Sequence, residues 1–355
     1  MPGQFLIYGS YGYTGKLIVQ EALRRGLVPV LAGRDVDKIG RQAAALGLEW
    51  RSFPLSNTAA LDHALQDTRL VLLVAGPFIN TSMPVVEACL RTGAHYLDIT
   101  GEINVYRHLH TRDEDAKNKG VMLATGMGFD VVPSDCLANH LANLLPTASE
   151  LKLAFTFQGV TRWTRGTLRS GLGQIKQGLL LRRKGKLVRQ TGGEKSIVVD
   201  FGDGPRSCGQ YTWGDVVTAY YSTRIPNIEV YFTAAPSMRR LTRWLSTMQR
   251  LIGWKLTRRL VGMAINLLPN GASPEQRSRT QSIFWGQVTD ASGERRSSRL
   301  QAPEPYDFTA LSAIRAVEKI LAGDYKPGFQ TPAMAFGSDF VLEIEGVNRE
   351  DLVIR

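Results

Sequence analysis

The 355-residue sequence has little of what marks membrane, secreted and disulfide-stabilised proteins. No window of about 18 uncharged apolar residues occurs, so no transmembrane helix is expected. The first residues, MPGQFLIYGS, lack the basic flank and long apolar stretch of a signal peptide. Cys89, Cys136 and Cys208 are far apart and odd in number, which argues against a disulfide framework and a zinc site. We therefore expect a soluble, cytoplasmic protein.

Acidic residues are scarce in the C-terminal part of the chain. Residues 1–133 hold 13 Lys and Arg against 13 Asp and Glu, whereas residues 134–355 hold 30 against 19. The formal net charge of +11 therefore lies in the C-terminal part, and we place a domain boundary at residue 133. Such a field could attract nucleic acid, anionic lipid or a phosphorylated acyl carrier. No nucleic-acid-binding motif accompanies the charge, so no nucleic-acid partner is expected.

Residues 1–133 alternate short apolar runs with longer amphipathic segments, which is typical of parallel strands joined by crossover helices. The predicted strands are Gln4–Tyr8, Pro29–Ala32, Glu49–Phe53, Leu70–Val74, His95–Asp98 and Val121–Ala124. The predicted helices are Thr14–Arg25, Val36–Leu46, Thr58–Leu65, Met83–Thr92 and Arg112–Lys119. This rhythm predicts an α/β protein with a Rossmann-type doubly wound parallel sheet.

The texture changes after residue 133. A helix is predicted near Ser134–Leu144, followed by alternating strands such as LKLAFTF and NIEVYFT. Residues 134–330 are therefore interpreted as an α+β domain built on a mostly antiparallel sheet. Residues 331–355 resume strand-like patterning and either return to the first domain or edge the second.

Three glycines in GSYGYTG follow the first predicted strand and precede the first predicted helix. The N-terminus of a helix presents unpaired N–H groups to an anion, and glycine lets a phosphate approach the backbone closely. The spacing is G-x-x-G-x-x-G and not G-x-G-x-x-G, so a plain tight turn remains an alternative. The predicted cofactor-binding residues of this loop are Gly9, Ser10, Tyr11, Gly12, Tyr13, Thr14 and Gly15.

The end of the second strand indicates which dinucleotide binds. An acidic residue there is typical of NAD, whereas Arg or Lys suits the 2′-phosphate of NADP. Gly33 and Arg34 end the strand and Lys38 follows one helical turn later, which favours NADP(H). Asp35 is the competing feature, because a shift of one residue would offer its carboxylate to the ribose.

Several blocks of the sequence together resemble the saccharopine dehydrogenase-like oxidoreductases, a family that includes trans-acting enoyl reductases. The blocks are GSYGYTG (9–15), LAGRD (31–35), VAGPF (74–78), VVEACLRTGAHYLDITGE (85–102), GFDVVPSD (128–135), SPEQRSRTQSIFWGQV (273–288) and KPGFQTPAMAFGSDF (326–340). The resemblance implies an N-terminal NAD(P)-binding domain and a C-terminal domain for substrate binding and dimerisation. It also implies hydride transfer between the two domains and a homodimer, and it leaves the substrate open.

Ligands of open parallel sheets bind beyond the C-terminal ends of the strands. The residues expected there on the ribose and nicotinamide side are Ala75, Gly76, Pro77, Phe78, Thr100, Gly101 and Phe129. Pro77 and Phe78 could instead serve only the turn and the packing. The candidate catalytic carboxylates are Asp98, Glu102 and Asp130, with Asp98 also able to tie loops together by accepting backbone N–H groups.

The chain has no tyrosine with lysine four positions later, so carbonyl reduction by a Tyr-x-x-x-Lys pair is disfavoured. Reduction of a C=C or C=N bond needs less from the protein, namely a polarising donor and a proton source. His108 and His110 form an H-x-H with no third ligand evident, so no metal is expected.

Val230–Pro274 contains no acidic residue and seven Arg or Lys. Within it, region 238–268 has the pattern of a basic amphipathic helix, which either packs on its own domain or contacts a membrane surface or acyl carrier. This pattern and the resemblance to a family that includes enoyl reductases together lead us to expect NADP(H)-dependent reduction of a C=C or C=N bond in a hydrophobic, acyl or lipid-like substrate. The alternatives are a saccharopine- or opine-type amino-acid dehydrogenase and a non-catalytic, membrane-associated NADP-binding protein.

Overall fold

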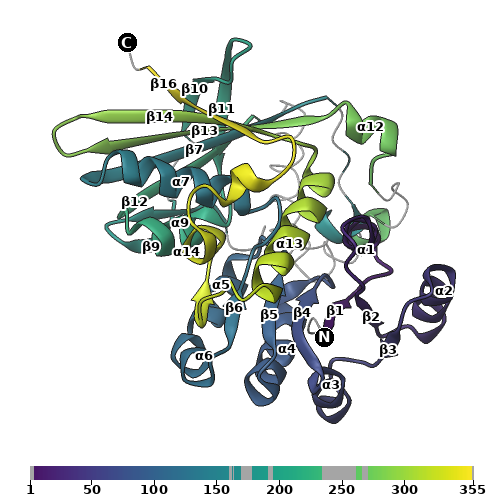
Figure 1. The fold of residues 1–355 in the computed structure, drawn as a ribbon. Helices are drawn as coiled ribbons and strands as arrows, with labels where there is room; N and C mark the ends of the chain where they lie inside the picture. The colour runs from purple at the N-terminus through teal and green to yellow at the C-terminus, as the bar shows by residue number, and fades with distance from the viewer. Residues whose placement is uncertain are drawn as a thin grey trace.

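The computed structural model describes residues 4–159, 162, 164–168, 178–190, 195–233, 261–265 and 271–353. The described residues form two regions, each built on one large sheet (Figure 1). The first sheet lies among the N-terminal helices, and the second lies across the top of the view in Figure 1.

The first sheet has seven parallel strands in the order β15-β6-β5-β4-β1-β2-β3. Its strands are β1 (Gln4–Tyr8), β2 (Val30–Gly33), β3 (Trp50–Ser52), β4 (Thr68–Leu73), β5 (His95–Asp98), β6 (Met122–Ala124) and β15 (Gly328–Gln330). The strand order reverses at β1, which lies between β2 and β4, so the switch point that binds ligands in such sheets lies at the end of β1. The predicted Rossmann-type doubly wound sheet is confirmed.

The strands of this sheet were recognisable because β2, β5 and β6 are buried at every position. The connecting helices are α1 (Tyr13–Arg24), α2 (Val36–Leu46), α3 (Thr58–Leu65), α4 (Phe78–Thr92), α5 (Ile103–His110) and α6 (Asp113–Lys119). Local capping explains the bounds of α2, because the Asp35 side chain accepts the N–H of Lys38 and Gly47 ends the helix at φ +66°.

Two helices differ from the sequence expectation. Helix α4 begins at Phe78, not Met83, and holds Pro84 within it. Proline is typical of a first helical turn, which made residue 83 look like a helix start, but the first turn of α4 lies before it. Helix α5 was not predicted, although half of its residues are buried.

The second sheet has nine strands, with the path β10-β11-β12-β7-β13-β14-β16 and the pair β8 and β9 beside β12. Its strands are β7 (Ala148–Gln158), β8 (Leu180–Arg183), β9 (Lys186–Arg189), β10 (Ser196–Asp200), β11 (Pro205–Tyr211), β12 (Asn227–Phe232), β13 (Gln281–Asp290), β14 (Arg295–Ala302) and β16 (Asn348–Leu352). Among the described pairs, β7 and β12 alone run parallel, so the sheet is mixed but mostly antiparallel.

Helices from the C-terminal part of the chain join the two regions. They are α7 (Val132–Leu144), α9 (Asp215–Thr223), α12 (Pro274–Ser278), α13 (Pro305–Leu321), α14 (Pro332–Phe336) and the 3₁₀ helix η1 (Phe340–Glu343). Helix α7 packs on the second sheet, whereas α13 packs against α1 and β4 of the first region. One apolar core therefore continues from the first sheet to the second. The C-terminal part of the chain contributes a strand to each sheet, because β15 pairs with β6 in the first sheet and β16 pairs with β14 at the edge of the second.

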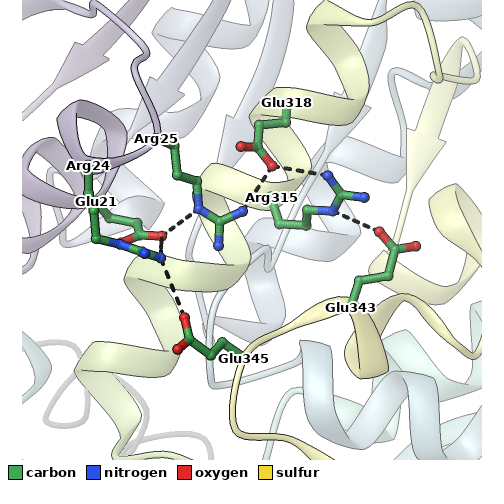
Figure 2. A network of polar contacts seen from close by, with 7 residues as sticks. All are labelled: Glu21, Arg24, Arg25, Arg315, Glu318, Glu343 and Glu345. Carbon is green, nitrogen blue, oxygen red and sulfur yellow. Dashed lines mark hydrogen bonds and ion pairs between the residues drawn. The ribbon is translucent and has the colours of Figure 1, made fainter.

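A network of ion pairs joins the C-terminal end of α1 to α13 (Figure 2). Glu21 accepts a hydrogen bond from Arg25 at 2.5 Å, and Arg25 also donates to Glu318 at 3.0 Å. Arg315 extends the network from Glu318 to Glu343, which lies on η1. Burial alone would raise the pKa of Glu21, but its hydrogen bonds from arginine outweigh burial and lower that pKa.

The basic region 238–268 lies outside the described residues, apart from residues 261–265, which are helical. In the part of the chain that the structure describes, no helix combines the length and the apolar character needed to cross a bilayer.

Candidate functional site

The glycine-rich loop joins β1 to α1 at the switch point of the first sheet. Gly9 adopts φ +96°, and its N–H donates to the carbonyl of Ala32 at 2.7 Å. A Cβ on Gly15 would lie 2.8 Å from the carbonyl oxygen of Ser10 and would collide with that of Gly9. These two glycines are therefore required by the backbone of the loop itself.

Helix α1 begins without help from a capping side chain. Gly12 is its N-cap, and its first turn holds no acidic residue. The loop before it is rigid, because buried Ser10 donates to the side chain of Gln42 at 2.8 Å and accepts from it at 3.0 Å through its carbonyl. The N–H groups in the first turn of α1 are therefore not bound by a capping side chain. A helix N-terminus of this kind suits an anionic group such as a diphosphate.

The residues after β2 divide into a free cation and a closed pair. Asp35 accepts the N–H of Lys38 at 3.1 Å with one oxygen and its ammonium group at 2.7 Å with the other. These hydrogen bonds from Lys38 lower the pKa of Asp35. Arg34 is exposed and, among the described residues, has no ion-pair partner. The structure thus gives Asp35 to the helix cap and leaves the guanidinium of Arg34 available at the strand end.

Two tyrosines of the loop contact different parts of the fold. The Tyr11 ring lies on Gly33, where a Cβ would collide with it, and the Lys38 ammonium lies 5.9 Å from the ring centre. Tyr13 instead leaves the first region, and its hydroxyl donates to the carbonyl of Ala272 at 2.8 Å. Among the predicted cofactor residues of this loop, Tyr13 therefore has a side-chain hydrogen bond to a described residue of the second region.

The loop after β5 braces the start of α4. The carboxylate of Glu102 accepts the N–H groups of Phe78 and Ile79, each at 2.9 Å, and Glu102 is 8% exposed. The loop before α4 is held as well, because Thr81 donates to the carbonyl of Ala75 at 2.7 Å. Both oxygens of Glu102 thus bind a helix N-terminus, an arrangement that favours a structural role.

Asp98 ties the ends of β5 and β6 together. Its buried carboxylate accepts from Tyr96 at 2.7 Å, Gly126 at 2.8 Å, Thr125 at 2.9 Å and Thr100 at 3.1 Å. Burial raises its pKa from 3.8 to about 6, although these donors oppose that effect. A carboxylate with so many donors is held in place as an acceptor and fits loop closure.

Asp130 is different, because no described residue donates a hydrogen bond to its half-buried carboxylate. Burial raises its pKa from 3.8 to about 7, and the negative charge of Glu102 adds to that rise. Its carboxylate lies against Gly101, where a Cβ would collide with it. Its backbone carbonyl accepts the indole N–H of Trp213 at 2.6 Å, which fixes the loop from the second region.

Aromatic side chains of the second sheet surround this loop. Phe129 lies 5.9 Å from Phe157, and Trp213 lies 4.9 Å from Phe155, measured between ring centres. Tyr211 continues the group and is 42% exposed. We call Phe129, Phe155, Phe157, Tyr211, Trp213 and Phe232 the aromatic group. The parallel pairing of β7 with β12 brings the C-terminal ends of both strands, which carry Phe157 and Phe232, to one edge of the sheet.

The predicted site residues thus gather at one edge of the first sheet, since all of its strands are parallel. Sequence reasoning missed Trp213 and Tyr306. Trp213 contacts Asp130, and Tyr306 packs edge-on against Tyr13 at 5.2 Å. No local motif marks either residue, because each reaches its partner across the fold. Among the described residues, no group of three or more His, Cys, Asp and Glu is arranged to hold a metal ion.

Comparison with known proteins agrees with this geometry. Residues 5–123 match the family model described as saccharopine dehydrogenase NADP binding domain. The chain is 34% identical over 140 residues to a trans-acting enoyl reductase of Mycobacterium leprae, covering 37% of this chain and 33% of that protein. It is 30% identical over 154 residues to a saccharopine dehydrogenase-like oxidoreductase of Rattus norvegicus, covering 38% of this chain and 36% of that protein. The matches span about a third of the length of these relatives.

A solved structure extends the likeness in fold to the whole chain. The apo saccharopine dehydrogenase (L-Glu forming) of Saccharomyces cerevisiae superposes with a TM-score of 0.66 at 11% sequence identity. The superposition covers 99% of this chain and 100% of that one. At this identity the likeness concerns the fold, including the second, mixed sheet.

Proposed function

We propose that this protein is an NADP(H)-dependent oxidoreductase, because residues 5–123 match the family model of the saccharopine dehydrogenase NADP binding domain. In the proposed reaction, a C=C or C=N bond of a hydrophobic, acyl or lipid-like substrate is reduced. The observation that carries the proposal is the juxtaposition of the glycine loop, Arg34 and Asp130 at one edge of the first sheet. Within the described part of the chain, the guanidinium of Arg34 has no ion-pair partner and the carboxylate of Asp130 has no hydrogen-bond donor.

The residues present fit the cofactor. A cradle of backbone at Gly9 and Gly15 admits no side chain, and the first turn of α1 has no capping side chain to compete with a diphosphate. Arg34 stands at the end of β2, where the adenosine ribose lies in Rossmann-type sites, and its guanidinium suits a 2′-phosphate. When bound, NADPH would supply the hydride for the reduction.

Asp130 is the proposed proton donor among the three candidate carboxylates. Its pKa of about 7 leaves a proton on a substantial share of molecules at neutral pH. The hydride would add to one atom of the C=C or C=N bond, and the proton of Asp130 would go to the other atom of that bond. Asp130 would be left as a carboxylate. Asp98 and Glu102 are less suited to this task, because their oxygens already accept several N–H or O–H groups.

The aromatic group supports a hydrophobic substrate. It begins next to Asp130 with Phe129 and Trp213 and reaches the partly exposed Tyr211. A small substrate with two carboxylates would call for cationic side chains at the same place. The similarity of this chain to a trans-acting enoyl reductase of Mycobacterium leprae supports the same preference.

The test is NADPH oxidation, followed at 340 nm, by the full chain with 2-enoyl thioesters of increasing chain length. We expect turnover that rises with chain length and is lost in Asp130→Asn. Asp62→Asn serves as the control, because Asp62 is a carboxylate on α3 that pairs with Arg91. Turnover with lysine plus 2-oxoglutarate in place of the thioesters would establish the amino-acid dehydrogenase instead.

The basic region 238–268 supports a peripheral contact with an anionic membrane or acyl carrier through its charge pattern. Flotation of the protein with anionic but not neutral vesicles tests that contact. Flotation without turnover on either substrate set would favour the non-catalytic, membrane-associated alternative. We also propose a homodimer, for which light scattering coupled to size-exclusion chromatography gives the mass.

A further inference from the structure

Tyr13 connects the proposed nucleotide loop to the second region. It is the first residue of α1 and directly follows the N-cap Gly12. Its hydroxyl donates to the carbonyl of Ala272 at 2.8 Å and accepts from Arg277 at 3.1 Å. A residue that only closed a phosphate loop would not need a side chain bound 259 positions away in the sequence.

The surface that receives Tyr13 is itself fixed. Gly271 has φ +88°, and a Cβ there would lie 2.6 Å from the Tyr13 ring, so this position leaves room for the ring alone. Arg277, which is largely buried, is oriented by Asp307 through a 2.9 Å ion pair. The Tyr13 hydroxyl therefore meets one acceptor and one donor whose positions are set by α12 and α13.

The contact continues beyond Tyr13. Its ring packs edge-on against Tyr306, with ring centres 5.2 Å apart. The Tyr306 hydroxyl accepts the N–H of Thr164 at 2.7 Å and lies 3.0 Å from the hydroxyl of Thr167. Three chain segments far apart in the sequence thus meet at the start of α1.

The other end of α1 is held by the same part of the chain. Arg25, just after the helix, donates to Glu318 of α13, as Figure 2 shows. Helix α1 is therefore held at both ends by residues that follow the first domain. A ligand that binds at its N-terminus acts on a helix that cannot shift without disturbing those contacts.

We infer that Tyr13 is a positioning residue that couples nucleotide binding at the glycine loop to the segment 271–280. The inference rests on the proposed function only for the binding of NADPH at that loop. In the nucleotide-bound protein, the Tyr13 hydroxyl holds residues 271–280 and α13 in fixed register with α1. The coupling is reciprocal, so weakening the Tyr13 contact also weakens nucleotide binding by the same factor.

Hydrogen exchange of the full chain with and without NADPH tests this coupling. In the native protein we expect NADPH to slow exchange in residues 9–18 and also in residues 271–280. In Tyr13→Phe, which keeps the ring and removes the hydroxyl, protection of residues 9–18 remains while protection of residues 271–280 is lost. NADPH affinity falls about fivefold, the lower end of typical couplings.

Tyr325→Phe is the matched control, because the Tyr325 ring packs against His95 with ring centres 4.2 Å apart. His95 begins β5, so this contact lies at the edge of the first sheet opposite the glycine loop. It should behave as the native protein does. Protection of residues 271–280 that survives in Tyr13→Phe would overturn the coupling, as would its absence from the native protein when residues 9–18 are protected. If NADPH protects neither segment of the native protein, the proposed function itself fails.

Discussion

The Asp130 carboxylate lies directly against Gly101, so that a Cβ on Gly101 would come within 3.0 Å of both Cβ and Cγ of Asp130. The two residues follow β5 and β6, which are neighbours in the first sheet. The indole N–H of Trp213, from the second region, donates to the backbone carbonyl of Asp130. Among the described residues, none donates a hydrogen bond to this carboxylate, so burial and the nearby charge of Glu102 raise its pKa without opposition from a donor.

Asp130 should make the folding stability fall as the pH rises from about 4 to about 7. Its pKa is about 7 in the folded protein against an ordinary 3.8, so the native state keeps a proton that the unfolded state has lost. In that window the free energy of unfolding loses at most about 1.4 kcal/mol per pH unit from this group. Urea unfolding at several pH values should therefore show a flatter profile for Asp130→Asn. Profiles that stay parallel to that of the native protein would contradict the raised pKa.

Arg34→Ala should weaken the binding of NADPH by about 10- to 100-fold, the value of one or two charge-assisted hydrogen bonds to a phosphate. NADH, which lacks the 2′-phosphate, should bind nearly as before. Titration calorimetry with both nucleotides measures the two affinities. Lys38→Ala is the matched control and should have a smaller effect, because its ammonium group is already paired with Asp35. Equal losses for both nucleotides would refute the role of Arg34.

Gly15→Ala should destabilise the protein by about 2–4 kcal/mol and abolish nucleotide binding. The added methyl group would collide with the carbonyl oxygens of Gly9 and Ser10, which are backbone atoms that cannot rotate away. Gly40→Ala provides the contrast, because a Cβ there meets only the Trp50 ring at 3.7 Å. This glycine lies inside α2, so alanine should stabilise the protein by about 0.5–1 kcal/mol. Thermal unfolding compares both variants.

The sequence contained enough information for the first sheet and its loop. Strands such as Leu70–Leu73 lie in a sheet covered on both sides, which makes them uniformly apolar and easy to recognise. The glycines at positions 9 and 15 are visible because the backbone needs them for its own geometry. The local sequence also favours Arg34 over Asp35 as the residue that faces the ribose, since Asp35 directly precedes α2 and its side chain caps an N–H group of that helix.

The sequence could not rank the candidate carboxylates. Asp98 ends a strand, and Glu102 and Asp130 follow strands, so the three carboxylates look equivalent in the sequence alone. Their difference arises from donors on other elements, such as the Phe78 amide that binds Glu102 and the Thr125 hydroxyl that binds Asp98. For the same reason the sequence could not show the contacts of the Tyr13 hydroxyl, because its partners Ala272 and Arg277 lie more than 250 residues later.

Glu102→Gln should lower stability without removing activity. In Glu102 each carboxylate oxygen accepts one N–H group, from Phe78 or Ile79. The amide of Gln keeps one such oxygen but turns its NH₂ group toward the second N–H, which is left without an acceptor at a cost of about 1–3 kcal/mol in the free energy of unfolding. The substitution also removes the negative charge that helps to raise the pKa of Asp130, so the midpoint of the pH–rate profile should move to lower pH. Thermal unfolding and NADPH oxidation across the pH range measure the two effects. A Glu102→Gln protein of native stability but without turnover would make Glu102, not Asp130, the reacting acid.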